Sequence, residues 1–380
     1  MHRPLLRAMC CPLSASGFPM TWPRALDPFE GDVLHAPAAA VHANAAVMTL
    51  ADAYETCRLV TRYHAHAFYF SIRFLPPEKR RAIWAIYAIC RYSDNLVDRA
   101  PATAAPADLL ARVDWWEKRL RAMDTALPII RAFADARARF DIPSQPLWDL
   151  LDGMRMDLTD ARYATWDELG RYCYCVASTI GLLCTPVLGY DGAAETLEYA
   201  ANLGIAMQLT NILRDVGTDA AMGRIYLPQD ELAAFGYDEE KIAAGVVDDA
   251  FRRLMAFQIA RARALYRASA PGIARLHRAG QFPVQAAATL YGGILGRIEA
   301  IDYHVYTHRA ALTKWDKIAR LPAIWWQTRA LRRASSPDTF PVSFNAPGAA
   351  RCRQDDPYAD FGPVYTTSSR IRSGDSNITW

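Results

Sequence analysis

Polar side chains recur at helical spacing in the stretch QLTNILRDVGTD, which begins at Gln208. If the stretch is helical, steps of three and four residues return to one side and align four of them: Gln208, Asn211, Asp215 and Asp219. Two carboxylates and amide oxygens on one face form a surface suited to Mg²⁺, with Mn²⁺ as the alternative. Mg²⁺ takes one or two carboxylates and completes its shell with water and phosphate oxygens. The stretch therefore predicts a metal-diphosphate site.

Three further residues add to this pattern, because Arg214, Arg224 and Tyr226 lie within or just after it. Arginines beside an acidic row are suited to gripping a metal-bound diphosphate. The simpler interpretation is the solvated face of a surface helix, since charges four residues apart are common. Asn211 and Gly217 argue against it because both are poor helix formers. The flanking GIAMQLTNIL is apolar, and acids on a buried helix are costly without a partner such as a metal.

A second acidic row lies upstream, in RRAIWAIYAICRYSDNLVDR. Steps of three and four residues place five of its residues on one helical stripe: Trp84, Tyr87, Arg91, Asp94 and Asp98. One such row is weak evidence, but two rows in one helical chain, each with an arginine, are more specific. Metal sites in bundles are built from facing helices. We therefore expect the two rows to face each other at the mouth of an apolar cavity.

Composition sets the class of protein. The chain has 380 residues, of which 52% are hydrophobic and 22% are charged, and its net charge is +3. This near-neutral charge does not indicate the basic surface that is typical of nucleic-acid-binding proteins. Eight cysteines without a paired CxxC framework indicate reduced thiols and a reducing compartment. No window offers about 18 consecutive apolar residues; the best run, Val176–Gly189, is interrupted by Ser178, Thr179, Thr185 and Pro186.

The chain divides into three parts by pattern. Residues 1–50 lack periodicity and are predicted to be a disordered leader, and 334–380 are polar and rich in Pro and Gly, typical of a disordered tail. Residues 51–333 carry helix-period apolar stripes and no strand-like alternation. We predict an all-α, single-domain helical bundle around a central apolar cavity. Pro271-Gly272 and Phe282-Pro283 are expected to separate the last two long helices.

Much of the region 57–320 resembles the squalene/phytoene synthase family of head-to-head trans-isoprenyl diphosphate synthases. The segments that carry the resemblance follow in family order: HAHAFYFSIRFLP, RRAIWAIYAICRYSDNLVD, GMRMDL, RYCYCVASTIGL, NILRDVGTDAAMGRIYLPQDEL and FPVQAAATLYGGILGRIEAIDY. GMRMDL and GRIYLPQDEL are most similar to the plant and cyanobacterial members. The resemblance implies the isoprenoid-synthase helical bundle.

It also implies an activity. A prenyltransferase of this kind joins two molecules of geranylgeranyl diphosphate head to head, through prephytoene diphosphate, to give phytoene and free diphosphate. That reaction is the first committed step of carotenoid biosynthesis, with Mg²⁺ or Mn²⁺ as cofactor and no NADPH expected. One alternative is a squalene or dehydrosqualene synthase that acts on farnesyl diphosphate. Another is a catalytically inactive helical assembly factor.

The resemblance implies roles for sixteen residues. It assigns metal binding to five of them: Asp94, Asp98, Asn211, Asp215 and Asp219. It assigns substrate binding, at the diphosphates or the cavity, to His64, Phe68, Tyr87, Arg91, Gln208, Asn211, Arg214, Arg224, Tyr226, Tyr291 and Arg309. It assigns direct catalytic roles to Asp94, Asp98, Asp215, Asp219, Tyr172 and Arg91. Either Tyr172 or a diphosphate oxygen takes the final proton. The chain departs from many family members at Asn95, where they carry a second Asp.

Other features have plainer interpretations. Asp157 is expected to form a structural ion pair, with Arg155 or with a neighbouring helix. The helices bearing Val176–Leu188 and Ala286–Ile294 are expected to supply cavity walls. The run Leu321–Trp326 either docks on the fold or touches a membrane surface, since Trp favours interfaces. By resemblance we expect a cytoplasmic, peripherally membrane-associated enzyme, in the plastid of a eukaryote, that hands its product to a carotenoid desaturase.

Overall fold

The computed structural model describes residues 48–98, 105–159 and 162–334. The helices are α2 (Leu50–His64), α3 (His66–Ser71), η3 (Ile72–Phe74), α4 (Pro77–Asp98), α5 (Pro106–Arg121), α6 (Pro128–Phe140), α7 (Gln145–Thr159), α8 (Trp166–Cys173), η4 (Tyr174–Ser178), α9 (Thr179–Leu188), α10 (Ala194–Ala220), α11 (Gln229–Phe235), α12 (Glu239–Ala244), α13 (Asp249–Ala274), α14 (Arg278–Ala300) and α15 (Lys314–Ala334). The prediction of an all-α fold is confirmed. Within the described residues, β-type pairing is limited to the two isolated bridges Arg162–Ile225 and Tyr190–Leu276.

Local sequence explains where many helices begin. Thr49 and Asp52 form a reciprocal capping box at the start of α2, which satisfies two backbone N–H groups that the helix leaves open. The side chain of Asp248 caps α13 by accepting a hydrogen bond from the N–H of Phe251. Proline opens α4, α5 and α6, where its missing N–H costs nothing.

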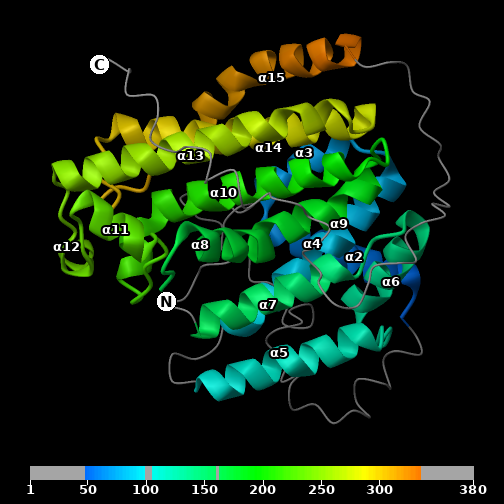
Figure 1. Ribbon diagram of the computed structural model, residues 1–380. Coiled ribbons are helices and arrows are strands. Elements are labelled where there is room, and N and C mark those ends of the chain that lie inside the picture. The colour runs from blue at the N-terminus through cyan, green and yellow to red at the C-terminus, as the bar shows by residue number, and fades with distance from the viewer. Residues whose placement is uncertain (1–47, 99–104, 160–161, 335–380) are drawn as a thin grey trace.

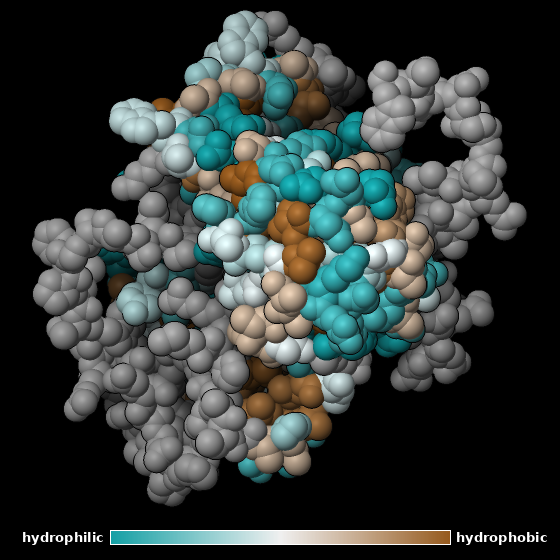
Figure 2. Space-filling model, turned by 90° about the vertical axis from the view of Figure 1, so that its left-hand side faces the viewer, coloured by the Kyte–Doolittle hydropathy of each residue, from teal (hydrophilic) through white to brown (hydrophobic). Residues whose placement is uncertain are grey.

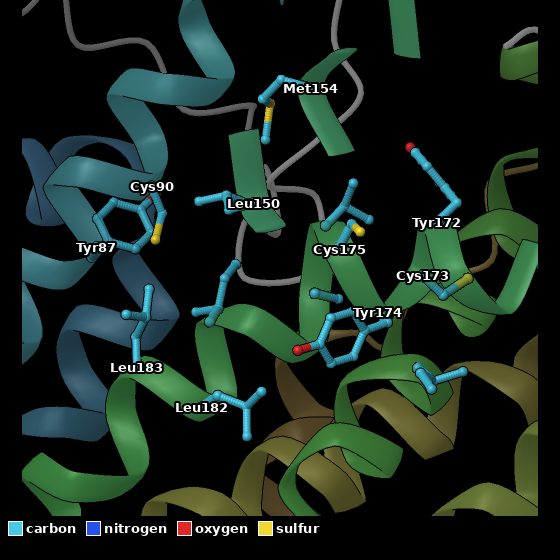
Figure 3. Packing of buried hydrophobic residues seen from close by; sticks show 14 of the residues in the cluster. Tyr87, Cys90, Leu150, Met154, Tyr172, Cys173, Tyr174, Cys175, Leu182 and Leu183 are labelled. Atoms are coloured by element: carbon cyan, nitrogen blue, oxygen red, sulfur yellow. The ribbon is translucent and has the colours of Figure 1, made fainter. Parts of the chain in front are cut away.

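The long helix α10 lies at the centre of the bundle. It packs against α13 and α14 on one side and against η4 and α9 on the other, as Figure 1 shows, with α15 as the outermost helix above α14. The other half of the core is organised around α4, which packs on α2, α6 and α9. In Figure 3, Tyr87 and Cys90 of α4 lie near Leu150 of α7 and Leu183 of α9 in one apolar cluster. The two acidic rows therefore belong to the two most central helices.

The continuous helical stretch Trp166–Leu188 runs from α8 through η4 to α9. Its length and composition would allow it to cross a membrane, but 78% of its most apolar part is buried inside the bundle. Its middle, η4, is a π-helix, a feature often found at functional sites. The backbone of α10 approaches η4 so closely that a Cβ on Gly204 would lie 2.4 Å from the Cα of Ser178. The apolar run is thus a core helix.

Two proline positions differ from expectation. Pro271 and Pro283 lie inside α13 and α14, rather than between them. Each costs a backbone hydrogen bond, but Pro271 is near the end of its helix and Pro283 is buried in a cavity wall. The predicted leader and tail lie almost wholly outside the described residues. In the coloured part of Figure 2, hydrophilic side chains are interspersed with several apolar patches.

Candidate active site

An apolar cavity of about 240 Å³ lies between α9, α10 and α14. Both stretches predicted to form its walls do so, through residues such as Ile180 and Cys184 of α9 and Leu290 and Ile294 of α14. Phe68 of α3 and Tyr291 of α14 also line it. Such a lining suits a hydrocarbon chain and excludes water.

Both acidic helices reach this cavity. Ile83 of α4 and Met207 of α10 are part of its wall. The first acid of each row, Asp94 or Asp215, comes about three turns after Ile83 on α4 and about two turns after Met207 on α10. Each helix therefore carries an apolar wall segment first and a charged segment after it, which is the order that a substrate with a hydrocarbon tail and a diphosphate head requires.

The first row holds a fully buried carboxylate. Asp94 has 0% exposure, and Arg91 Nη1 donates a hydrogen bond of 2.7 Å to Asp94 Oδ2. Asp98 is the last residue of α4, but its side chain lies outside the described part of the structure. One helical turn before Arg91, Tyr87 is buried with its ring 5.7 Å from that of Phe68, which connects it to the cavity wall.

The second row gathers two arginines on one acid. The Arg214 guanidinium binds Asp215 through both oxygens, at 3.1 Å from Nε to Oδ1 and 2.5 Å from Nη2 to Oδ2. Arg309 Nε reaches Asp215 Oδ1 at 3.2 Å from a distant part of the chain. Arg214 and Asp215 are both buried, whereas the Arg309 side chain is 37% exposed. Two cations on one carboxylate leave positive charge to bind an anion.

The surroundings of Asn211 show whether the second row could hold a metal ion. Its Nδ2 donates to Gln208 Oε1 at 3.3 Å, while no group in the described part of the chain hydrogen-bonds to its buried Oδ1. An amide oxygen buried in this way costs stability unless a donor or cation completes it. Among the described side chains, no three His, Cys or acidic groups converge enough to hold a metal alone. The donors fit an ion that shares its shell with diphosphate oxygens.

The end of the second row borders a small pocket. Asp219, Arg224 and Tyr226 line it together, and the N–H of Arg224 donates to the carbonyl of Asp219 at 2.9 Å. The bridge between Arg162 and Ile225 holds this segment in place. Residues predicted from the end of the QLTNILRDVGTD pattern are therefore brought to its last acid.

Asp157 is placed differently from expectation. Arg155 pairs with Asp114, Glu117 and Asp152 instead, so the predicted ion pair between Arg155 and Asp157 is wrong. Residues two apart on a helix point to opposite sides, which explains the error. Asp157 is buried and accepts a 3.0 Å hydrogen bond from the Tyr226 hydroxyl.

A tyrosine cluster surrounds this acid. The Tyr172 hydroxyl donates to that of Tyr226 at 3.4 Å, and their rings are stacked 5.2 Å apart. Tyr163 packs on both rings. Burial raises the pKa of Asp157, and Arg224 and the two hydroxyls only partly offset it. Burial also raises the pKa of Tyr172 and of Tyr226 well above the ordinary tyrosine value, so both hydroxyls keep their protons.

His64 ends α2, and its ring is edge-on to that of Tyr63, with centroids 4.8 Å apart. Its predicted role at the substrate stays a prediction.

Comparison with known proteins bears on this arrangement. The family model described as squalene/phytoene synthase matches residues 61–316. The chain belongs to the squalene/phytoene synthase family. The match covers both acidic rows, the tyrosine cluster and the segment that carries Arg309.

Individual relatives agree with the family match. A 15-cis-phytoene synthase of Synechococcus elongatus is 42% identical over 291 residues, which cover 73% of this chain and 94% of that protein. A chloroplastic phytoene synthase of Narcissus pseudonarcissus is 45% identical over 284 residues, covering 73% of this chain and 66% of that protein.

Solved structures show the same fold. A dehydrosqualene synthase crystallised with a ligand superposes with a TM-score of 0.68 at 27% identity, covering 74% of this chain and 98% of that one. A squalene synthase from Alicyclobacillus acidocaldarius gives 0.63 at 28% identity, covering 67% and 95%. The predicted isoprenoid-synthase bundle is confirmed.

Proposed function

We propose that this family member is a phytoene synthase, which joins two geranylgeranyl diphosphates head to head to form phytoene. The observation that carries the proposal is a pair of buried acid-arginine rows on the two central helices that also line one apolar cavity. The relatives at 42% and 45% identity named as phytoene synthases favour the C20 substrate over farnesyl diphosphate.

The acids and arginines divide the work on the two diphosphates. Asp94 and Asp98 would hold Mg²⁺, or Mn²⁺, at one diphosphate, and Asn211, Asp215 and Asp219 would do so at the other. When bound, the metal neutralises the leaving diphosphate and so favours breakage of the C–O bond. Arg91, Arg214 and Arg309 neutralise further phosphate oxygens through charge-assisted hydrogen bonds. The electron pair of the broken bond leaves with the diphosphate and an allylic cation remains.

The cavity protects that cation. Its apolar wall excludes water, which would otherwise capture the cation, and the faces of Phe68 and Tyr291 stabilise positive charge without attacking it. The double bond of the second substrate then attacks, and loss of a proton gives the cyclopropyl intermediate, prephytoene diphosphate. A second ionisation and rearrangement join the two C1 carbons. A final proton is lost to a diphosphate oxygen, because burial raises the pKa of Tyr172 and keeps its hydroxyl protonated, and phytoene remains.

A product assay tests the proposal. The purified protein is incubated with Mg²⁺ and either geranylgeranyl or farnesyl diphosphate, with and without NADPH, and the hydrocarbon products are analysed by chain length. We expect phytoene from the C20 substrate without NADPH. A C30 product alone, or a strict need for NADPH, would point to squalene-type chemistry, and release of no product would favour a non-catalytic protein.

We also propose that α15 rests on a membrane surface. Its large apolar side chains stay exposed, with Trp315 at 78%, Trp325 at 48% and Trp326 at 61%. Arg329 lies 4.9 Å from the Trp325 ring, and basic residues beside aromatic ones are typical of helices in the plane of anionic membranes. Lys317 of α15 also lines the cavity. The enzyme would be bound peripherally to a membrane of the cytoplasm or of the plastid. An apolar product would pass from the cavity into that membrane, where a carotenoid desaturase would consume it.

Vesicle sedimentation tests this second proposal. We expect binding to phosphatidylglycerol vesicles that falls at least tenfold in Trp325→Ala/Trp326→Ala. Phe257→Ala on α13, which removes another aromatic side chain that is 39% exposed, is the control and should bind like the wild type. Equal binding by all three proteins would rule out α15 as the contact.

A further inference from the structure

The irregular segment 301–313, between α14 and α15, crosses the second acidic row. Arg252 fixes its start through a two-oxygen ion pair with Asp302, at 3.1 Å and 2.7 Å. Further along, Val305, Ala310 and Leu312 are buried, and Leu312 lines the cavity. The segment is therefore docked on the bundle at several points.

At Gly217 the backbone of this segment packs directly on α10. A Cβ at position 217 would lie 2.6 Å from the Cα of Tyr306 and 3.0 Å from the carbonyl oxygen of Val305. Both atoms belong to the backbone and cannot rotate away. This contact explains a glycine inside a helix, where it costs about 1 kcal/mol relative to alanine.

Tyr306 has little freedom to retreat. Its hydroxyl lies 3.1 Å from that of Tyr237, and its ring packs on Phe251 with centroids 5.3 Å apart. Gly245 also lies against the ring, since a Cβ there would be 3.4 Å from Tyr306 Cγ. An added methyl group at position 217 would therefore push the backbone of the segment, rather than one side chain.

Arg309 lies three residues after this contact, and its partner Asp215 lies two residues before Gly217. The segment thus runs opposite to α10 and brings Arg309 Nε to 3.2 Å from Asp215 Oδ1. To reach ordinary contact distance from a methyl at 217, the backbone at Tyr306 must retreat by roughly 0.8 Å. A shift of that size is enough to lose the hydrogen bond and to misplace a substrate-binding group.

We propose that Gly217 is a positioning residue that sets the place of Arg309 at the diphosphate. The inference rests on the proposed function, because it takes Arg309 to bind the substrate's diphosphate. Gly217 touches no substrate itself and acts through the 301–313 segment. Any side chain at 217 would lift the segment at Tyr306 and weaken diphosphate binding.

The test compares Gly217→Ala with Gly296→Ala, since Gly296 lies in helix α14 and no described atom is within 4 Å of a Cβ there. Hydrogen exchange of residues 301–313 is measured together with KM and kcat for geranylgeranyl diphosphate. We expect faster exchange and a tenfold or greater rise in KM for Gly217→Ala, and neither for Gly296→Ala. Tyr306→Ala, which loosens the segment without altering α10, should raise KM in the same way.

A double-mutant cycle with Arg309→Ala decides the mechanism. If Gly217 acts through Arg309, KM for the double variant should lie within twofold of that for Arg309→Ala alone. Multiplying effects, or unchanged KM in both Gly217→Ala and Tyr306→Ala, would overturn the inference while the wild-type enzyme still makes phytoene. If the wild type makes no product, the proposed function fails instead, and the exchange data alone test whether Gly217 holds the segment.

Discussion

The two acidic rows obtain their positive charge in different ways. In the first, Arg91 and Asp94 are three residues apart on one helix. In the second, Asp215 is bound by its neighbour Arg214 and also by Arg309, 94 residues away. The first row is thus formed by residues close together in one helix, and the second is assembled by the tertiary fold. We therefore expect loss of the acid Asp94 to affect mainly chemistry, and loss of the acid Asp215 to affect chemistry and stability together.

The largest effects should come from the central acids. Asp94→Ala and Asp215→Ala should each lower turnover at saturating Mg²⁺ by about 10³-fold, because charge stabilisation of the leaving group is lost. Asp215→Ala should also lower the free energy of unfolding by about 3 kcal/mol, roughly twice the loss in Asp94→Ala, since it removes the acid shared by two arginines. Urea unfolding measures this, with the exposed Asp249→Ala as control. Near-normal turnover in either variant would refute its metal role.

Asn211→Leu separates function from stability within the second row. Loss of an oxygen ligand should lower turnover by about 10²-fold. The free energy of unfolding should stay level or rise by about 1 kcal/mol, because the buried Oδ1 lacks a hydrogen-bond partner among the described groups. Turnover and thermal unfolding are measured on the same preparation. Unfolding at much lower temperature with full activity would mean that Asn211 is a structural residue.

Substitution of Arg309 and substitution of Arg91 should affect different properties of the enzyme. Arg309→Ala should raise KM by about 30-fold, which corresponds to the loss of one charge-assisted hydrogen bond of about 2 kcal/mol. The free energy of unfolding should be almost unchanged, because the Arg309 side chain is 37% exposed. Arg91→Ala should affect both KM and stability, because Arg91 is only 14% exposed and pairs with a fully buried acid. Added salt should weaken the contribution of Arg309 to substrate binding more than that of Arg91, because Arg309 is the more exposed of the two. Identical salt dependence in the two variants would contradict the contrast.

The smallest effect concerns pH and Asp157. Burial raises its native pKa above the ordinary value of 3.8, so the folded state holds its proton longer than the unfolded chain. The contribution of Asp157 to stability must then fall as pH rises from about 3.8 through the native pKa. Asp157→Asn removes this fall, so its free energy of unfolding should gain on that of the wild type as pH rises across that window. Turnover should drop no more than about tenfold. A difference in unfolding free energy that stays constant from pH 4 to 8 would contradict the shift.

Local pattern and tertiary contact set the limits of sequence prediction here. The helical fold, the start of α4 at Pro77 and both cavity walls follow from apolar periodicity and from proline, which act within one helix. The charge pairing of Arg91 with Asp94 is equally local. The contact of Gly217 with Tyr306 and the bond from Tyr226 to Asp157 join residues 89 and 69 positions apart. Such pairs depend on how segments pack, which periodicity within a single helix does not encode.

In the proposed mechanism, the two acidic rows act on one pair of substrate molecules. The most direct measurement is anomalous diffraction from Mn²⁺ in crystals of the protein with an unreactive geranylgeranyl diphosphate analogue. We expect Mn²⁺ against Asp94 and Asp98 and against Asn211, Asp215 and Asp219, with diphosphates between them and both hydrocarbon chains in the apolar cavity. Mn²⁺ bound away from either row, or a diphosphate that contacts neither, would contradict it.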